Sequence, residues 1–173
     1  FVDITKVEEI EKAITPFTKV VYVESLSNPL LEAADLEAIS GVCKKYSVKF
    51  VVDNTFTPMI LTPANYGADI VIHSLTKFIN GASDIIAGAI CGTTEFIQGL
   101  MDLHMGPLMI LGPTMDPTVA AKISLRIPHL ALRMQEHGRR GQIFAERLDA
   151  LGVKVVYPGL PGHPDHELMK RQY

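Results

Sequence analysis

Short apolar runs alternate with longer amphipathic stretches along this chain, and few folds are compatible with that alternation. The runs Val20–Val23, Phe50–Val52 and Ile70–Ile72 have the length of buried strands. The segment 35–46 lies between the first two runs. Its apolar residues recur at helical spacing: Leu36, Ile39, Val42 and Cys43. Alternating strands and helices are typical of βα units. We therefore predict an α/β fold, with a mostly parallel sheet flanked by helices.

The same patterns predict further elements toward the C-terminus. A run rich in small residues, 85–91, is predicted to be a fourth strand, and Val153–Val156 a last one. Helices are expected over 93–105 and 117–151. Because proline lacks an amide donor and clashes with the preceding turn, the longer helix should be interrupted near Pro128.

Composition excludes several classes of function. Of the 173 residues, 47% are hydrophobic and 20% are charged, which is enough apolar material for a packed core. With a net charge of −3 and no basic run, neither a nucleic acid nor a membrane is an expected partner. No apolar run reaches the roughly 18 residues of a membrane span. The two cysteines and the histidines lack metal-ligand spacing, so no metal is expected.

Polar residues of chemical interest follow three of the predicted strands. Glu24 ends the first, Asp53 the second, and residues 73–77 the third. Ligands of open parallel sheets bind beyond the carboxyl ends of the strands. We therefore expect a functional site at this edge of the sheet.

Lys77 and Asp53 stand out at this edge, although each has an ordinary explanation. Alone, Lys77 is more simply a solvated lysine and Asp53 a turn residue. Ser74 and Thr76 add hydroxyl donors beside the lysine. An aldehyde cofactor with a phosphate and a pyridine ring needs an amine for a Schiff base, donors for the phosphate and a carboxylate for the ring nitrogen. These four side chains match that requirement.

Longer motifs resemble one family. The stretch Asp69–Ser83 resembles the lysine motif of the pyridoxal-phosphate enzymes of cysteine and methionine metabolism, and Val52–Phe56 resembles their ring-nitrogen motif. Glu24–Pro29 is similar to a third signature, and Tyr157–Leu160 with His163–Pro164 to the beginning of the small domain. The resemblance runs along essentially the whole chain, with the four motifs in the family's order.

The resemblance implies a fold and a domain division. It implies an incomplete large domain of the pyridoxal-phosphate transferase fold, the fold of aspartate aminotransferase. Residues 1–128 would form part of the cofactor-binding large domain, and 129–173 a linking helix and the start of the C-terminal small domain. We expect the chain to be a piece of a longer protein, because the family's phosphate loop, ring-stacking Tyr and carboxylate-binding Arg have no counterpart in it. The piece alone is therefore expected to be inactive.

The resemblance also assigns roles to residues, with pyridoxal 5′-phosphate as the cofactor. Lys77 would form the Schiff base and transfer protons, and Asp53 would pair with the protonated ring nitrogen. Ser74 and Thr76 would donate to the phosphate. Asn28 would lie near the phenolic oxygen of the ring.

Within the family, the segments Leu111–Met115, Arg126–Leu130 and Leu132–Met134 resemble plant-type methionine γ-lyases. This implies a carbon–sulfur lyase that converts L-methionine to methanethiol, 2-oxobutanoate and ammonia. Cystathionine γ-lyase and cystathionine γ-synthase remain alternatives, as does a non-catalytic truncated subunit. The family further implies a cytoplasmic homotetramer built from dimers that share active sites.

Other eye-catching residues receive no catalytic role. His73, at a strand end, is expected to be a packed structural residue. The arginines at helical spacing are expected to form a solvated or interface face: Arg126, Arg133, Arg139, Arg140 and Arg147.

Overall fold

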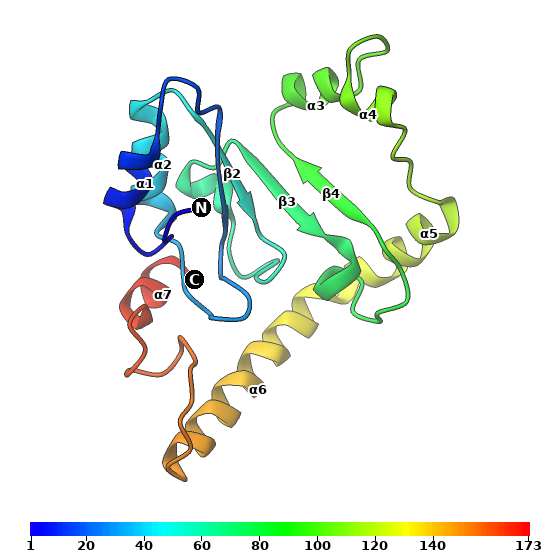
Figure 1. The fold of residues 1–173 in the computed structure, drawn as a ribbon. Coiled ribbons are helices and arrows are strands. Elements are labelled where there is room, and N and C mark those ends of the chain that lie inside the picture. Colours follow the sequence, from blue (N-terminus) through cyan, green and yellow to red (C-terminus); the bar gives the residue numbers. More distant parts are fainter.

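A four-stranded sheet with the order β1-β2-β3-β4 organises the computed structural model, which describes residues 1–173 (Figure 1). Its strands are β1 (Val20–Glu24), β2 (Lys49–Asp53), β3 (Ile70–Ser74) and β4 (Gly88–Cys91). The first three run parallel, and β4 is antiparallel to β3. The predicted α/β fold with a mostly parallel sheet is confirmed.

Seven α-helices accompany the sheet. They are α1 (Val7–Ala13), α2 (Leu36–Lys45), α3 (Thr94–Leu100), α4 (Pro107–Leu111), α5 (Pro117–Arg126), α6 (Leu130–Ala150) and α7 (His166–Gln172). The break expected near Pro128 is present as a single 3₁₀ turn, Ile127–His129, between α5 and α6. The helix expected over 93–105 is shorter, because α3 ends at Leu100.

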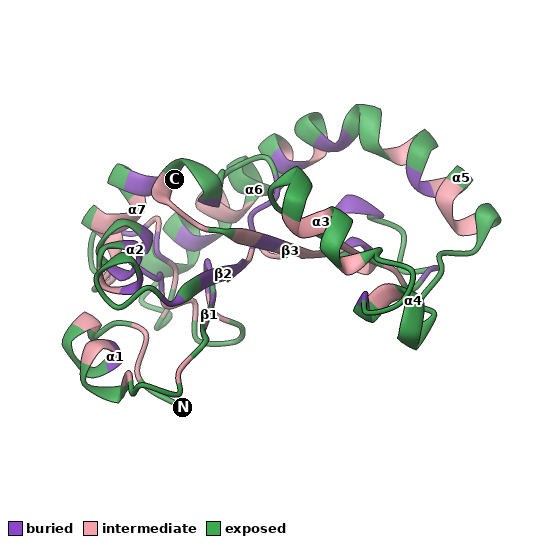
Figure 2. Cartoon of the chain, turned by 90° about the horizontal axis from the view of Figure 1, so that it is seen from above, coloured by how far each residue is buried: buried purple, intermediate pink, exposed green.

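The first hydrophobic cluster fixes α2 against the sheet. The side chain of Asp35 caps the helix by accepting a hydrogen bond from the Ala38 amide at 3.1 Å. Leu36 and Ile39 then face Phe50 and Val52 of β2, and all four side chains are fully buried. Figure 2 shows buried residues on α2 and on β2, the two elements that this cluster joins. This packing sets the position of the strand that ends at Asp53.

A second cluster lies on the other side of the site. It joins the turn Leu75–Ile79, which follows β3, to α5 and α6. Leu75 and Ile79 point into this cluster together with Ile123 and Met134. The segment that carries Lys77 is therefore anchored by the apolar residues on either side of it.

The C-terminal segment differs from expectation. Residues 153–156 form no strand, because none of the four strands lies beside them to exchange backbone hydrogen bonds. After them the chain returns to the N-terminal half. Gln172 is buried there, accepting from the Leu36 amide at 3.0 Å and donating to the Ala34 carbonyl at 2.9 Å. The division at 128/129 stays a prediction, and α7 contacts the first part of that division.

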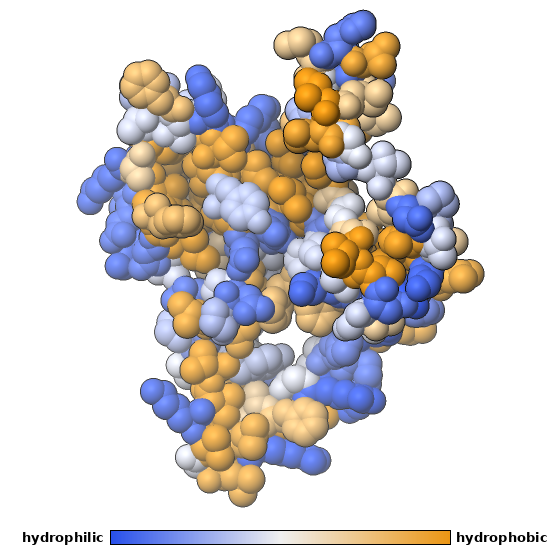
Figure 3. All heavy atoms as spheres, turned by 45° about the vertical axis from the view of Figure 1, so that its right-hand side comes forward, coloured by the Kyte–Doolittle hydropathy of each residue, from blue (hydrophilic) through white to orange (hydrophobic).

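The arm that carries α3 and α4 leaves many hydrophobic side chains exposed. Neither helix contains a buried residue. Figure 3 shows hydrophobic atoms gathered where this arm projects from the molecule. The exposed residues of the arm are Met101, Leu103, Met105, Met109, Ile110 and Leu111. None of the helices combines the length and the apolar character required to cross a membrane.

We predict that Phe50→Ala lowers the free energy of unfolding by about 3–5 kcal/mol, because it leaves a cavity in the first cluster. Urea denaturation of the full-length protein measures the change. Phe17→Ala is the matched control, since Phe17 is exposed and should cost little. Equal losses for the two variants would contradict this account of the core.

Candidate active site

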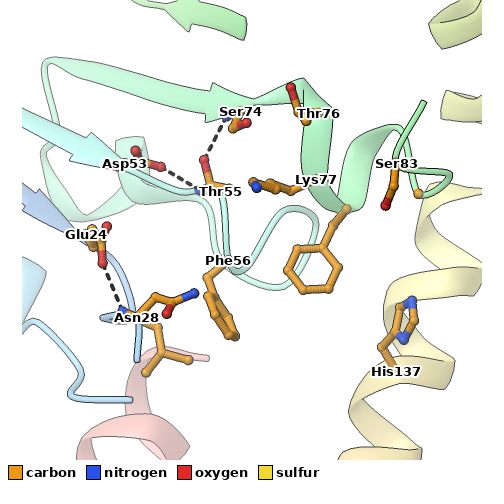
Figure 4. A pocket seen from close by; sticks show the side chains of 13 residues that line it. Glu24, Asn28, Asp53, Thr55, Phe56, Ser74, Thr76, Lys77, Ser83 and His137 are labelled. Carbon is orange, nitrogen blue, oxygen red and sulfur yellow. Dashed lines mark hydrogen bonds between the residues drawn. The ribbon is translucent and has the colours of Figure 1, made fainter. Parts of the chain in front are cut away.

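The carboxyl ends of β1, β2 and β3 open onto a pocket of about 950 Å³ (Figure 4). Its lining comes from the ends of these strands, from the turn after β3 and from α6. The lining residues are Glu24, Leu26, Asn28, Asp53, Thr55, Phe56, Ser74, Thr76, Lys77, Phe78, Gly81, Ser83 and His137. All five residues predicted from the sequence lie in this single pocket. The structure thus brings them together, while their roles remain a proposal.

Asp53 is held in one orientation by two donors. The Tyr22 hydroxyl donates to Oδ2 at 2.8 Å, and the Thr55 amide donates to Oδ1 at 2.9 Å. Partial burial and the neighbouring Asp53 carboxylate raise the pKa of Tyr22. Its hydroxyl therefore stays protonated and can donate the hydrogen bond to Asp53. The Asp53 carboxylate therefore presents a fixed negative group at the pocket wall.

Ser74 and Thr76 differ in how free their hydroxyls are. The Ser74 amide donates to the Thr55 hydroxyl at 2.7 Å, which leaves the Ser74 hydroxyl itself at the pocket. The Thr76 hydroxyl already accepts from the Ala87 amide at 3.1 Å and donates to the Ala87 carbonyl at 3.3 Å. It can donate to a phosphate only by giving up the second of these bonds. Ser74 is thus the readier donor of the two.

Lys77 projects from a tight turn. The Asn80 amide donates to the Leu75 carbonyl at 2.9 Å, and the Gly81 amide to the Lys77 carbonyl at 2.8 Å. Gly81 adopts a positive φ of 72°, which favours glycine. Figure 4 shows the Lys77 amine pointing into the pocket, bonded to none of the side chains drawn there. An exposed primary amine in this position is available to react with a carbonyl compound.

Asn28 is placed by a closed loop after β1. Its backbone amide donates to the Glu24 carboxylate at 3.0 Å, and the Ser27 backbone amide donates to the Glu32 carbonyl at 2.9 Å. The Ser27 hydroxyl also accepts from the Glu32 amide at 2.9 Å. These bonds leave the Asn28 side-chain amide at the pocket (Figure 4).

Sequence reasoning missed several residues of the site. Tyr22 and Thr55 hold Asp53 and Ser74, as described above. Phe56, Phe78 and His137 form an aromatic row, with ring centroids 5.7 Å apart in the first pair and 5.8 Å in the second. The sequence did contain a pattern that could have predicted Tyr22. Side chains two positions apart on a strand share a face, and Tyr22 lies two positions before Glu24. No sequence pattern could have predicted His137, because its helix reaches the pocket only through tertiary packing.

Two of the arginines expected on a solvated or interface face point inward instead. Arg126 pairs with Asp84 at 2.6 Å and also donates to the Asn80 side chain. Arg133 donates to the carbonyls of Phe78 and Ile79. Arg139 and Arg140 do lie on the exposed face, where both bind Glu136. Helical spacing alone did not separate these two groups.

Comparison with known proteins adds independent information. The sequence profile of the family described as "Cys/Met metabolism PLP-dependent enzyme" matches residues 1–173. The chain is 53% identical over 171 residues to a methionine gamma-lyase of Arabidopsis thaliana, covering 98% of this chain and 39% of that protein. It is 41% identical to an L-methionine gamma-lyase of Porphyromonas gingivalis, covering 99% of this chain and 43% of that protein. A cystathionine gamma-lyase of Macaca fascicularis is 39% identical, with the same coverages. The chain thus spans about two fifths of the length of these relatives.

We predict that the pH dependence of stability depends in part on His73. Its Nδ1 is buried without a partner, and burial lowers the pKa of the ring despite the opposing attraction of Asp53. Below about pH 6.5 the unfolded chain takes up a proton on this side chain while the folded chain does not. The free energy of unfolding should therefore decrease as the pH is lowered from about 6.5, until the pH falls below the folded-state pKa of His73.

Urea denaturation between pH 7.5 and pH 5 tests this prediction. His73→Gln cannot titrate and should lose less stability over that interval than the unmodified protein. His104→Gln, at an exposed position, is the control. Identical pH profiles for His73→Gln and the unmodified protein would show that His73 does not contribute.

Proposed function

Because the chain belongs to the Cys/Met metabolism PLP-dependent enzyme family, we propose that the protein containing it is a pyridoxal-phosphate-dependent carbon–sulfur lyase. Its proposed reaction is the γ-elimination of L-methionine to methanethiol, 2-oxobutanoate and ammonia. One observation carries the proposal: an exposed amine, an oriented carboxylate and hydroxyl donors line the same pocket. Lys77, Asp53 and Ser74 provide these groups from three neighbouring segments of the fold.

The residues present fit this cofactor. The Asp53 carboxylate is fixed at the end of β2, where it can hold a proton on a ring nitrogen. The Ser74 hydroxyl is a donor suited to a phosphate oxygen, and Lys77 supplies the amine. A volume of about 950 Å³ lies within the range of small-molecule sites. When bound, pyridoxal phosphate supplies a conjugated ring that withdraws electrons from the α-carbon of an amino acid.

The side chains of this pocket then have distinct tasks. Nζ of Lys77 would hold the cofactor and, when free, would take the proton from the substrate α-carbon. Asp53 keeps the ring nitrogen protonated, and the Tyr22 and Thr55 donors keep Asp53 aligned for that task. Ser74 and Thr76 hold the phosphate. Asn28, which lines the same pocket, would lie near the phenolic oxygen.

Methionine is favoured over cystathionine as the substrate by the names of the relatives. Two of the three relatives described above are called methionine gamma-lyases, and they are 53% and 41% identical to the chain. The relative called cystathionine gamma-lyase follows at 39%, which keeps that reaction and the γ-synthase reaction as second candidates. A product assay separates them. Methanethiol from methionine supports the first, whereas cysteine from cystathionine, or cystathionine from an activated homoserine, supports the others.

We predict that Lys77→Ala in the full-length protein reduces methanethiol and 2-oxobutanoate formation by at least about 100-fold, because no other amine replaces the proton carrier. Borohydride reduction of the protein with pyridoxal phosphate, followed by peptide mass analysis, should place the cofactor on Lys77. Lys19→Ala, at an exposed lysine outside the pocket, is the matched control. Full activity of Lys77→Ala would refute the proposal.

The 173-residue chain by itself is proposed to have no lyase activity, because it spans about two fifths of its relatives. The intact Lys77 and Asp53 count against a parent protein that is only a non-catalytic scaffold. Turnover of methionine by the isolated chain with added cofactor would contradict the first of these statements. Absence of any cofactor attachment in the full-length protein would favour the scaffold.

For the full-length protein we also propose a cytoplasmic homotetramer of dimers that share active sites. The exposed hydrophobic arm of α3 and α4 supports self-association, since monomers rarely leave such contiguous apolar surface open. Ile110 and Leu111 are exposed on this arm.

We predict that the double substitution Ile110→Glu with Leu111→Glu shifts the full-length protein to smaller species, because charges would be buried at the contact. Sedimentation velocity measures the species present. Phe17→Glu, also at an exposed position but outside the arm, should leave the distribution unchanged. If the arm variant sediments like the unmodified protein, the arm is not part of the assembly.

A further inference from the structure

A single arginine on α6 binds the backbone directly after Lys77. Nη1 of Arg133 donates to the Phe78 carbonyl at 2.6 Å, and Nη2 donates to the Ile79 carbonyl at 2.9 Å. These are the first two carbonyls beyond the lysine. The guanidinium therefore bridges the end of the turn from which the Lys77 side chain projects.

The arginine is itself fixed from the other side. Its Nε donates to Nδ1 of His129 at 3.0 Å, and Nη2 also reaches the Arg126 carbonyl at 3.4 Å. Gly81 leaves the space that the guanidinium occupies, because a Cβ there would overlap Nη1 of Arg133. Arg133 is thus held in one place by the end of α5 and the 3₁₀ turn that follows it, while it binds the turn after β3.

The chemistry of the bridge requires arginine. A guanidinium is planar and presents several donors in a fixed fork, so it can bind two neighbouring carbonyls at once. A lysine ammonium is a point charge on a flexible stem and lacks that geometry. Hydrogen bonds from a charged donor are also shorter and stronger than neutral ones.

Arg126 offers an instructive contrast. It binds the side chains of Asn80 and Asp84, which lie farther along the loop, and its guanidinium lowers the pKa of Asp84. Those contacts fix the loop to α5 through side chains. Only Arg133 binds the backbone of the two residues that follow Lys77.

We propose that Arg133 is the positioning residue of Lys77: by fixing the Phe78 and Ile79 carbonyls it sets where Nζ lies in the pocket. This inference rests on the proposed function and specifies how the reactive amine is kept in place. Without the bridge, the turn retains its apolar anchors but samples more conformations. Covalent attachment of the cofactor to Lys77 then slows, while the groups that hold the cofactor non-covalently stay in place.

The test compares Arg133→Lys and Arg133→Met with Arg140→Lys in the full-length protein. Arg140 lies on the same helix but binds only Glu136 on the exposed face, which makes it the matched control. The first readout needs no cofactor: amide hydrogen exchange of the peptide 75–83 in the cofactor-free protein. We expect exchange about tenfold faster in both Arg133 variants and unchanged in the control.

The second readout separates positioning from general stability. The rate of covalent attachment to Lys77, measured by borohydride trapping, should fall at least tenfold. The dissociation constant for overall binding of pyridoxal phosphate should change less than threefold. Methylguanidinium added to Arg133→Ala should restore part of the attachment rate, because it can occupy the vacated site. Equal losses of affinity and attachment rate would indicate a merely structural role and overturn the proposal.

The remaining outcomes are also decisive. Wild-type exchange and attachment rates in Arg133→Lys would overturn the proposal. If Arg133→Met fails to fold, Arg133→Lys decides, because its stem preserves the packing and its ammonium cannot bridge both carbonyls. If the unmodified protein never attaches the cofactor at Lys77, the proposed function fails, and the exchange measurement still decides whether Arg133 fixes the turn.

Discussion

The parallel register of β1, β2 and β3 is the constraint on which the pocket depends. Glu24 lies beside Asp53 in this register, and Asp53 lies beside Ile72, two residues before Ser74. Because side chains two positions apart share a face, Asp53 and Ser74 emerge on the same side of the sheet. A shift of one residue would send one of them to the opposite face. The packing of Phe50 and Val52 on α2 holds this register.

The two halves of the site belong to different hydrophobic clusters. Asp53 ends the strand packed in the first cluster, whereas Lys77 lies in the turn anchored by Leu75 and Ile79 in the second. Their relative placement therefore depends on the contacts between the clusters. The β2–β3 pairing and the bond from the Ser74 amide to the Thr55 hydroxyl provide them on the sheet side. Arg133 restrains the turn from the helix side.

Much of the fold and of the pocket was predictable, for a local reason. A buried strand that ends in a polar residue is visible in the sequence, so β1 to β3 and the pocket positions of Asp53, Ser74 and Lys77 followed from short patterns. The motifs predicted the family, which the profile match confirms.

The predictions that failed concern contacts between residues far apart in the sequence. The inward orientation of Arg126 and Arg133, the return of Gln172 to α2 and the missing strand at 153–156 depend on partners far along the chain. Helical periodicity distinguishes apolar from polar faces, but it does not distinguish a solvated arginine from one that binds a distant carbonyl.

A flexible side chain on a restrained backbone suits the chemistry proposed for Lys77. The lysine stem has to reach both the cofactor and the substrate α-carbon, so the long side chain must retain its freedom. Any additional freedom of the turn would multiply the positions of Nζ and lower the fraction that is competent to react. Restraint is therefore most useful on the carbonyls next to the lysine and least useful on the amine. The structure has this distribution, with Arg133 bound to the backbone of residues 78 and 79 and the Lys77 side chain left exposed. Supporting contacts of this kind commonly decide whether a reactive group is merely present or correctly aligned.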